Sequence, residues 1–311
     1  MKLVVQIPAL DEAARIADVV AAVPRDIAGF DAVEVLVIDD GSSDGTEEVA
    51  RAAGADHVIR FAHNRGLSVA FQTGLREALR VGADIIVNTD GDHQYAADGI
   101  VDLVAPILAG EADIVVGDRR PHENTDFSWV KRRLQRLGSR VVALAGAPGA
   151  RDAASGFRAY SREAALDVMV INRFTYTVES TIQAGLGPLQ TTWVPVRTNP
   201  ATRDSRLSRS TSGYVRRNAG TILRVFATYR PIRFFGAIGL VLGIGALVSF
   251  TPFLRAWLVE GRTDGNLQSI ILGAILSLSA VLMLAIGVLG HLIGVAREIA
   301  HRTLTEVRDL R

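Results

Sequence analysis

The sequence predicts an α/β domain with a mostly parallel β-sheet covered by helices on both faces, followed by an interfacial helix and a two-helix transmembrane hairpin. Two observations predict this fold. Segments typical of strands and helices alternate through about the first 200 of the 311 residues, as they do in α/β domains. Hydrophobic residues make up 49% of the chain, and their excess lies near the C-terminus in two long uncharged segments.

The N-terminal part contains six expected strands and six expected helices. The strands are predicted at residues 3–8, 33–39, 57–60, 84–89, 113–117 and 189–196. The helices are predicted at residues 12–23, 46–53, 66–81, 100–109, 129–145 and 161–169. Neither a G-x-G-x-x-G nor a G-x-x-x-x-G-K-[ST] phosphate loop is present. Cysteine is absent, which excludes disulfides and thiolate metal sites.

The C-terminal part is expected to cross a membrane twice. Residues 234–254 and 267–290 carry no charge, and each segment is long enough as a helix to span about 30 Å. The alternative is a buried hairpin in a soluble core. A helix at 211–231 combines apolar residues with arginines and suits the membrane interface.

Arginines are concentrated ahead of the first span. Between residues 203 and 233 a single acidic residue, Asp204, accompanies eight arginines: Arg203, Arg206, Arg209, Arg216, Arg217, Arg224, Arg230 and Arg233. The positive-inside rule therefore predicts a multi-pass protein of the cell membrane with both termini in the cytoplasm. Nucleic acid is an unsuitable partner for this cluster, because the cluster adjoins a membrane span where lipid phosphates are nearer.

Carboxylates follow two of the predicted strands. Asp90 and Asp92 come directly after one strand, with D-x-D spacing, and Asp39 and Asp40 end another. The carboxyl ends of parallel strands form the usual ligand-binding edge of such a sheet. Two carboxylates at this edge suit Mg²⁺ or Mn²⁺ that holds a diphosphate. The alternative is a polar turn in which an aspartate caps the next helix.

Five short motifs occur together in one order. They are 7–12 (IPALDE), 39–46 (DDGSSDGT), 64–66 (NRG), 90–95 (DGDHQY) and 152–158 (DAASGFR). In order and spacing the chain resembles glycosyltransferase family two. The last motif and the paired spans resemble the polyprenyl-phosphate branch of that family, the bacterial relatives of dolichyl-phosphate mannosyltransferase. The resemblance implies a GT-A fold, a nucleotide-diphosphate sugar donor, Mg²⁺ or Mn²⁺, and a polyprenyl- or dolichyl-phosphate acceptor.

The resemblance also assigns roles to residues of this chain. Those implied to bind the nucleotide are Pro8, Glu12, Asp39, Asp40, Asp90 and Gly91. Those implied to hold the metal are Asp90, Asp92 and Gln94, and the implied catalytic residues are Asp152, Arg119 and Arg206. Asp152 could orient the acceptor, act as a base or hold an arginine. Two positions depart from the family pattern, where Asn is common in place of Asp11 and His in place of Tyr95.

The expected function is an inverting glycosyltransferase that moves a sugar to a lipid phosphate at the cytoplasmic membrane face. The expected domains are 1–210, catalytic; 211–231, interfacial helix; and 232–311, the spans and tail. One alternative is a polysaccharide synthase of the same fold, which would normally carry a Q-x-x-R-W motif that this chain lacks. The other is a membrane scaffold with a degenerate transferase domain. The spans leave room for a homo-oligomer.

Overall fold

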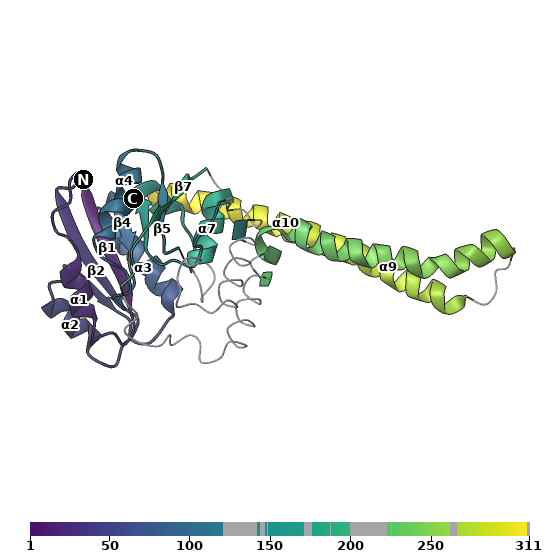
Figure 1. Ribbon diagram of the computed structural model, residues 1–311, viewed down its shortest axis with the longest axis horizontal. Helices are drawn as coiled ribbons and strands as arrows, with labels where there is room; N and C mark the ends of the chain where they lie inside the picture. Colours follow the sequence, from purple (N-terminus) through teal and green to yellow (C-terminus); the bar gives the residue numbers. More distant parts are fainter. Residues whose placement is uncertain are drawn as a thin grey trace. The chain divides into compact units, whose positions relative to one another are not determined.

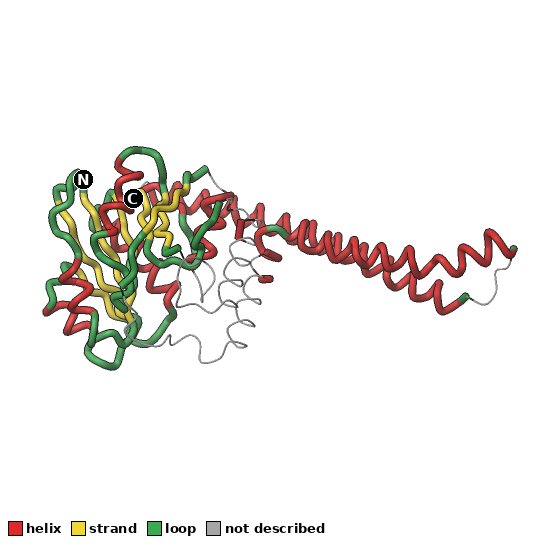
Figure 2. The backbone as a smooth tube through the Cα atoms, viewed as in Figure 1, coloured by secondary structure: helices red, strands yellow, loops and turns green. Residues whose placement is uncertain are grey.

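The structure is a computed structural model of the whole chain. It describes residues 1–120, 142–143, 147, 149–170, 176–186, 188–199, 223–224, 226–261 and 266–309. The chain divides into two compact units, which are described separately: Met1–Asn218 together with His301–Arg311, and Ala219–Ala300. Figure 1 shows the elements in sequence colours, and Figure 2 distinguishes the strands of the first unit from the long helices of the second.

The first unit contains a seven-stranded sheet in the order β3-β2-β1-β4-β6-β5-β7. Its strands are β1 (Lys2–Ala9), β2 (Ala32–Asp39), β3 (His57–Arg60), β4 (Ile85–Asn88), β5 (Ile114–Asp118), β6 (Arg158–Ser161) and β7 (Thr191–Pro195). Strand β6 runs antiparallel to both β4 and β5, while the other neighbouring strands are parallel. The predicted, mostly parallel sheet is therefore confirmed.

Two apolar layers cover the sheet, one on each face. Because successive strand residues point to opposite faces, Leu3 and Val5 of β1 belong to one layer and Val4 to the other. Helices α1 (Ile16–Ala22), α2 (Thr46–Ala52) and α4 (Gly99–Leu108) supply the first layer. Helices α3 (Leu67–Arg80), α6 (Arg162–Asp167) and α7 (Tyr176–Leu186) supply the second. The sheet is thus buried on both faces, as an α/β domain requires.

The six predicted strands all occur, with small differences at their ends. Strand β6 and helix α7 are additional. Strand β6 reads Arg-Ala-Tyr-Ser, and so its sequence lacks the apolar run by which the other strands are recognised. The predicted helix at 12–23 forms only from Ile16, because a turn occupies the residues before it. Apart from residues 142–143, the predicted helix at 129–145 lies outside the described residues.

The second unit contains two long helices, α9 (Pro231–Glu260) and α10 (Leu267–Asp309). Both are long and apolar enough to cross a membrane, over Pro231–Val259 and Leu267–Arg297. Only 11% and 17% of their most apolar stretches are buried, so most of this apolar surface faces outward. The two helices could therefore form the predicted hairpin. The predicted interfacial helix at 211–231 lies mostly outside the described residues.

Small and hydroxylated residues join α9 to α10. Ser249 Oγ donates to the carbonyl of Ser269 at 3.0 Å, and Ser269 Oγ donates back to the carbonyl of Ser249. A Cβ atom on Gly239 would lie 3.1 Å from the carbonyl oxygen of Ala280, so the backbones approach closely there. Such contacts are typical of helices that associate in lipid, where apolar burial between them adds little.

We expect Gly239→Val to destabilise the hairpin and Gly243→Val to leave it intact. Both changes replace a glycine of α9, but a Cβ on Gly243 meets no atom within 4 Å. Overpacking at Gly239 should cost about 1–3 kcal/mol, because the backbone carbonyl of Ala280 cannot rotate away. Thermal unfolding of the full chain in detergent measures the difference. Equal melting temperatures for the two variants would contradict this packing.

Candidate active site

Three parallel strands bring Pro8, Asp39 and the D-x-D turn to one edge of the sheet. Strand β1 pairs with β2 on one side and with β4 on the other, so the segments that follow these strands leave from neighbouring positions. Pro8 lies in β1, and a Cβ on Gly91 would lie 3.4 Å from the carbonyl oxygen of Pro8. The turn after β4 therefore packs against the end of β1.

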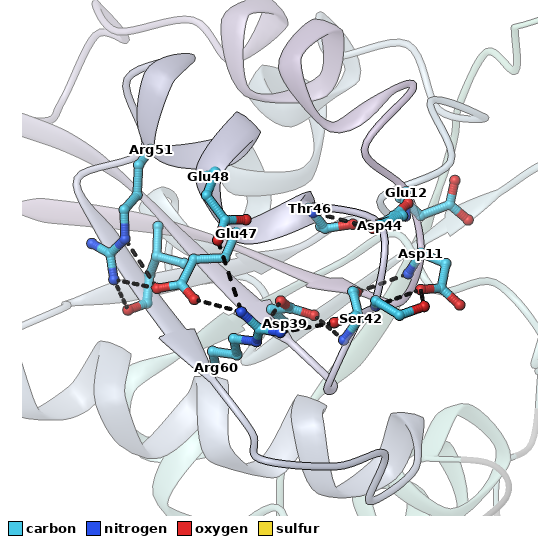
Figure 3. Close-up of polar contacts among 12 residues, drawn as sticks. Asp11, Glu12, Asp39, Ser42, Asp44, Thr46, Glu47, Glu48, Arg51 and Arg60 are labelled. Carbon is cyan, nitrogen blue, oxygen red and sulfur yellow. Dashed lines mark hydrogen bonds and ion pairs between the residues drawn. The ribbon is translucent and has the colours of Figure 1, made fainter.

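The loops after β1 and β2 are joined by hydrogen bonds in both directions (Figure 3). Ser42 Oγ accepts from the backbone N–H of Asp11 at 2.8 Å, and Thr46 Oγ1 accepts from that of Glu12 at 3.0 Å. In return, Asp11 Oδ1 accepts from the backbone N–H of Ser43 at 2.9 Å. Ser42 and Thr46 of the 39–46 motif thus hold the loop after β1, which carries the largely buried Glu12.

Asp11, the departure from the family pattern, adopts a left-handed backbone conformation with φ of 51°. Asparagine is among the residues that tolerate this conformation best. An asparagine oxygen could also accept the bond from Ser43 that the Asp11 carboxylate accepts here. The departure therefore retains the structural role of the position and changes its charge.

The two neighbouring carboxylates at the end of β2 have different environments. Both oxygens of Asp40 accept backbone N–H groups from residues 65–66, at 2.7 and 2.9 Å. Asp39 is fully buried, and its Oδ1 accepts from Ser42 N at 2.8 Å. Its Oδ2 has no hydrogen-bond partner among the described residues, and the nearest cationic group, Arg60 Nε, is 3.7 Å away. Asp39 thus retains a buried acceptor, whereas Asp40 fixes the loop after β3.

The D-x-D turn follows β4. Burial and, to a lesser extent, the charge of Asp92 raise the pKa of Asp90 to about 6, against the opposing effect of Arg119 and Arg158. Asp92 Oδ1 accepts from the backbone N–H of Gln94 at 3.1 Å, which closes the turn. A carboxylate whose charge is disfavoured by a second carboxylate nearby forms a suitable site for a cation.

The donor set of this turn fits Mg²⁺ or Mn²⁺ bound together with substrate. In the described part of the chain no cluster of three or more His, Asp or Glu side chains surrounds a possible metal position. The ligands that the sequence predicts are the carboxylates of Asp90 and Asp92 and the amide of Gln94. Mg²⁺ is commonly held by one or two carboxylates, with phosphate oxygens and water as its other ligands.

Gly156 packs against the side chain of Asp90. A Cβ on Gly156 would lie 2.7 Å from Asp90 Oδ1 and 2.9 Å from the hydroxyl of Tyr176, so only glycine fits. The peptide on either side is held: Tyr95 OH accepts from Gly156 N at 3.1 Å, and Asn88 Nδ2 donates to Gly156 O at 2.8 Å. Tyr95, the second departure from the family pattern, therefore supports this glycine.

Asp152 and Arg119 form a bidentate ion pair. Arg119 Nε donates to Asp152 Oδ2 at 2.7 Å, and its NH2 donates to Oδ1 at 2.9 Å. Asp152 is only 3% exposed, while the arginine side chain is 23% exposed. The sequence left three roles open for Asp152. The structure shows the ion pair that the third role, holding an arginine, requires.

Arg158 is a buried residue beside the site to which the sequence assigned no role. It is fully buried and donates to the carbonyls of Ala153 and Ser155, at 2.9 and 2.8 Å. It also donates to the hydroxyls of Ser180 and Thr181 on α7, both at 2.9 Å. Arg158 thus fixes the loop that carries Asp152 and Gly156. The only sequence signal was its place in the 152–158 motif. Arg206 lies outside the described residues.

Comparisons with known proteins show the family of the chain. Residues 4–168 match the profile of the family described as "Glycosyl transferase family 2". Glycosyltransferase AglJ of Haloferax volcanii is 32% identical over 306 residues, which cover 92% of this chain and 91% of that protein. Polyprenol monophosphomannose synthase of Mycolicibacterium smegmatis is 34% identical over 138 residues, 42% of this chain and 52% of the relative.

A third relative is UDP-N-acetylglucosamine–dolichyl-phosphate N-acetylglucosaminyltransferase of Methanococcus voltae, 29% identical over 62% of this chain and 83% of its own length. Among solved structures, glucosyl-3-phosphoglycerate synthase of Mycobacterium tuberculosis in complex with Mn²⁺, uridine diphosphate and glucosyl-3-phosphoglycerate matches with a TM-score of 0.55 and 25% identity. The match covers 73% of this chain and 80% of the other. The chain therefore belongs to glycosyltransferase family 2, and its first unit has the GT-A-like α/β fold.

Proposed function

We propose that this glycosyltransferase transfers a sugar, with inversion, from a nucleotide-diphosphate sugar to a polyprenyl or dolichyl phosphate at the cytoplasmic face of the cell membrane. The observation that carries the proposal is the paired carboxylates of Asp90 and Asp92 in one chain with two helices long and apolar enough to cross a membrane. Relatives named for polyprenol and dolichyl-phosphate acceptors support the same choice.

The nucleotide would bind at the ends of β1 and β2. The buried Oδ2 of Asp39, which has no hydrogen-bond donor among the described residues, would accept an N–H group of the base, because a buried acceptor without a donor is unfavourable. Pro8, Glu12 and Gly91 would surround the nucleoside, and Asp40 would act indirectly by holding residues 65–66.

The diphosphate would bind at the D-x-D turn. Asp90, Asp92 and Gln94 would hold Mg²⁺ or Mn²⁺, which when bound neutralises the diphosphate and stabilises it as a leaving group. The solved glucosyl-3-phosphoglycerate synthase contains Mn²⁺ together with uridine diphosphate. Arg119 would add positive charge on the side of the site that faces Asp90.

The reaction would be a single displacement at the anomeric carbon. An oxygen of the lipid phosphate forms the new bond to this carbon, while the bond to the nucleotide diphosphate breaks and its electron pair leaves with the diphosphate. The second pKa of a phosphate monoester is about 6, so the nucleophile is already largely anionic near pH 7. A general base is therefore unnecessary, and Asp152 would act by orienting Arg119. Arg206 as a further phosphate ligand stays a prediction.

The membrane arrangement is part of the same proposal. Both termini and the catalytic domain would be cytoplasmic, with residues 261–266 on the opposite side, because the arginines lie ahead of the first span. In this arrangement the catalytic domain would lie on the same side of the membrane as cytoplasmic nucleotide sugars.

The transfer reaction itself is the first test. Purified full-length protein in detergent, supplied with a short polyprenyl phosphate, Mn²⁺ and single nucleotide sugars in turn, should form a lipid-linked sugar that mass spectrometry detects. Asp92→Ala should abolish product formation, as should EDTA, because the diphosphate charge would not be neutralised. Full turnover in EDTA would show that the D-x-D turn does not act through a metal.

The two neighbouring aspartates of β2 should respond differently to the same isosteric change. Asp39→Asn should weaken binding of the nucleoside diphosphate that the active donor releases, and it should change the melting temperature little. Asp40→Asn should instead lower the free energy of unfolding by about 1–3 kcal/mol, since one of its two backbone donors loses its acceptor. Calorimetric titration and thermal unfolding separate the two effects. The reverse pattern would contradict the assignment.

The role of Asp152 can be tested with a double-mutant cycle. If Asp152 acts only through Arg119, Asp152→Asn should slow transfer about tenfold or more in the wild-type protein and hardly at all beside Arg119→Met. The double variant contains neither charge, which avoids an unpaired buried ion. A further loss of rate on adding Asp152→Asn to Arg119→Met, together with loss of an acidic limb in the pH–rate profile, would favour a general base instead.

A further inference from the structure

The D-x-D turn is hydrogen-bonded to the segment that follows β7. Asn199 donates hydrogen bonds to three consecutive carbonyls: its backbone N–H to that of Gln94 at 2.9 Å, and its side-chain amide to those of His93 at 2.9 Å and Tyr95 at 3.3 Å. Residues 95 and 198 also form an isolated antiparallel bridge. One residue after β7 thus satisfies the backbone carbonyls of residues 93–95.

Other contacts of this turn hold its two ends, at Gly91 beside β1 and at Tyr95 beside Gly156. The turn follows β4 and precedes α4, so its carbonyls have no partners from regular secondary structure. His93 has φ of 60°, a left-handed conformation that is uncommon for a residue other than glycine. Within the turn, the backbone N–H of Gln94 donates to Asp92 Oδ1 at 3.1 Å. The conformation of His93 therefore depends on the donors that Asn199 supplies.

We propose that Asn199 is a positioning residue for the cation at the D-x-D turn. The inference rests on the proposed function, in which Asp92 and Gln94 hold Mg²⁺ or Mn²⁺. Asn199 donates its hydrogen bonds to backbone carbonyl groups of the turn. It would therefore act on the cation indirectly, by fixing the backbone that carries Asp92 and Gln94. Mutation of a residue that orients metal ligands in this way typically lowers the affinity for the metal by about tenfold to a hundredfold.

The test is the affinity of the full-length protein for Mn²⁺, measured in detergent by loss of the free Mn²⁺ signal in electron paramagnetic resonance. The titration is repeated with uridine diphosphate and with guanosine diphosphate present. Asn199→Ala and the similarly sized Asn199→Leu should each raise the apparent dissociation constant about tenfold. Thr198→Ala is the matched control, since Thr198 is exposed and its backbone bridge survives the change; it should stay within about twofold of wild type.

Melting temperatures without metal separate positioning from a general loss of fold. The proposal expects both Asn199 variants to melt close to wild type without Mn²⁺ and to gain less stability when Mn²⁺ is added. Wild-type affinity in both variants would overturn it, and so would unfolding of both below the assay temperature. Asp92→Ala tests the underlying assignment: if it binds Mn²⁺ as well as wild type does, the proposed metal site is wrong, whatever Asn199 does.

Discussion

Repulsion between carboxylates gathered at one edge of the sheet is the constraint on which the rest of the site depends. The parallel pairing of β2, β1 and β4 places Asp39, Asp40 and Asp90 at neighbouring strand ends. Each carboxylate needs a compensating group, and most have one within the protein. Backbone N–H groups donate hydrogen bonds to Asp40, and a guanidinium pairs with Asp152. Asp39 Oδ2, which has no hydrogen-bond donor among the described residues, and the Asp90 carboxylate, whose pKa is raised, are the groups proposed to meet the substrate and its cation.

The parts of the site that depend on local sequence could be predicted, and those that depend on distant contacts could not. The strands before Asp39 and Asp90 are apolar runs, and the D-x-D spacing lies within one turn, so both were recognisable. The different roles of Asp39 and Asp40 could not be predicted, because Asp40 differs from Asp39 in binding backbone N–H groups some 25 residues further along the chain. Strand β6 was missed because it begins with Arg158 and has no apolar run. The carbonyl and hydroxyl groups that allow this arginine to be buried lie outside the strand, and so its sequence did not reveal them.

The two units are stabilised in different ways, as expected if they lie in different solvents. The first unit buries apolar layers on both faces of its sheet, which is the main stabilising contribution in water. The hairpin instead leaves most of its apolar surface exposed and relies on close backbone approach at Gly239 and on the paired serines 249 and 269. That arrangement is stable in lipid, where exposed apolar surface carries no penalty.

The reciprocal bonds between the loops after β1 and β2 also bear on how a nucleotide could be recognised. Loops that must become ordered on binding reduce affinity by the conformational entropy they lose. Here Ser42 and Thr46 already hold residues 11–12, and Asp11 holds Ser43, so the loops can keep one conformation before any ligand arrives. The length of each loop is fixed by the other, and an insertion in either would break several of these bonds at once. A pocket of this kind would discriminate between bases by rigid fit, with little adaptation to the wrong one.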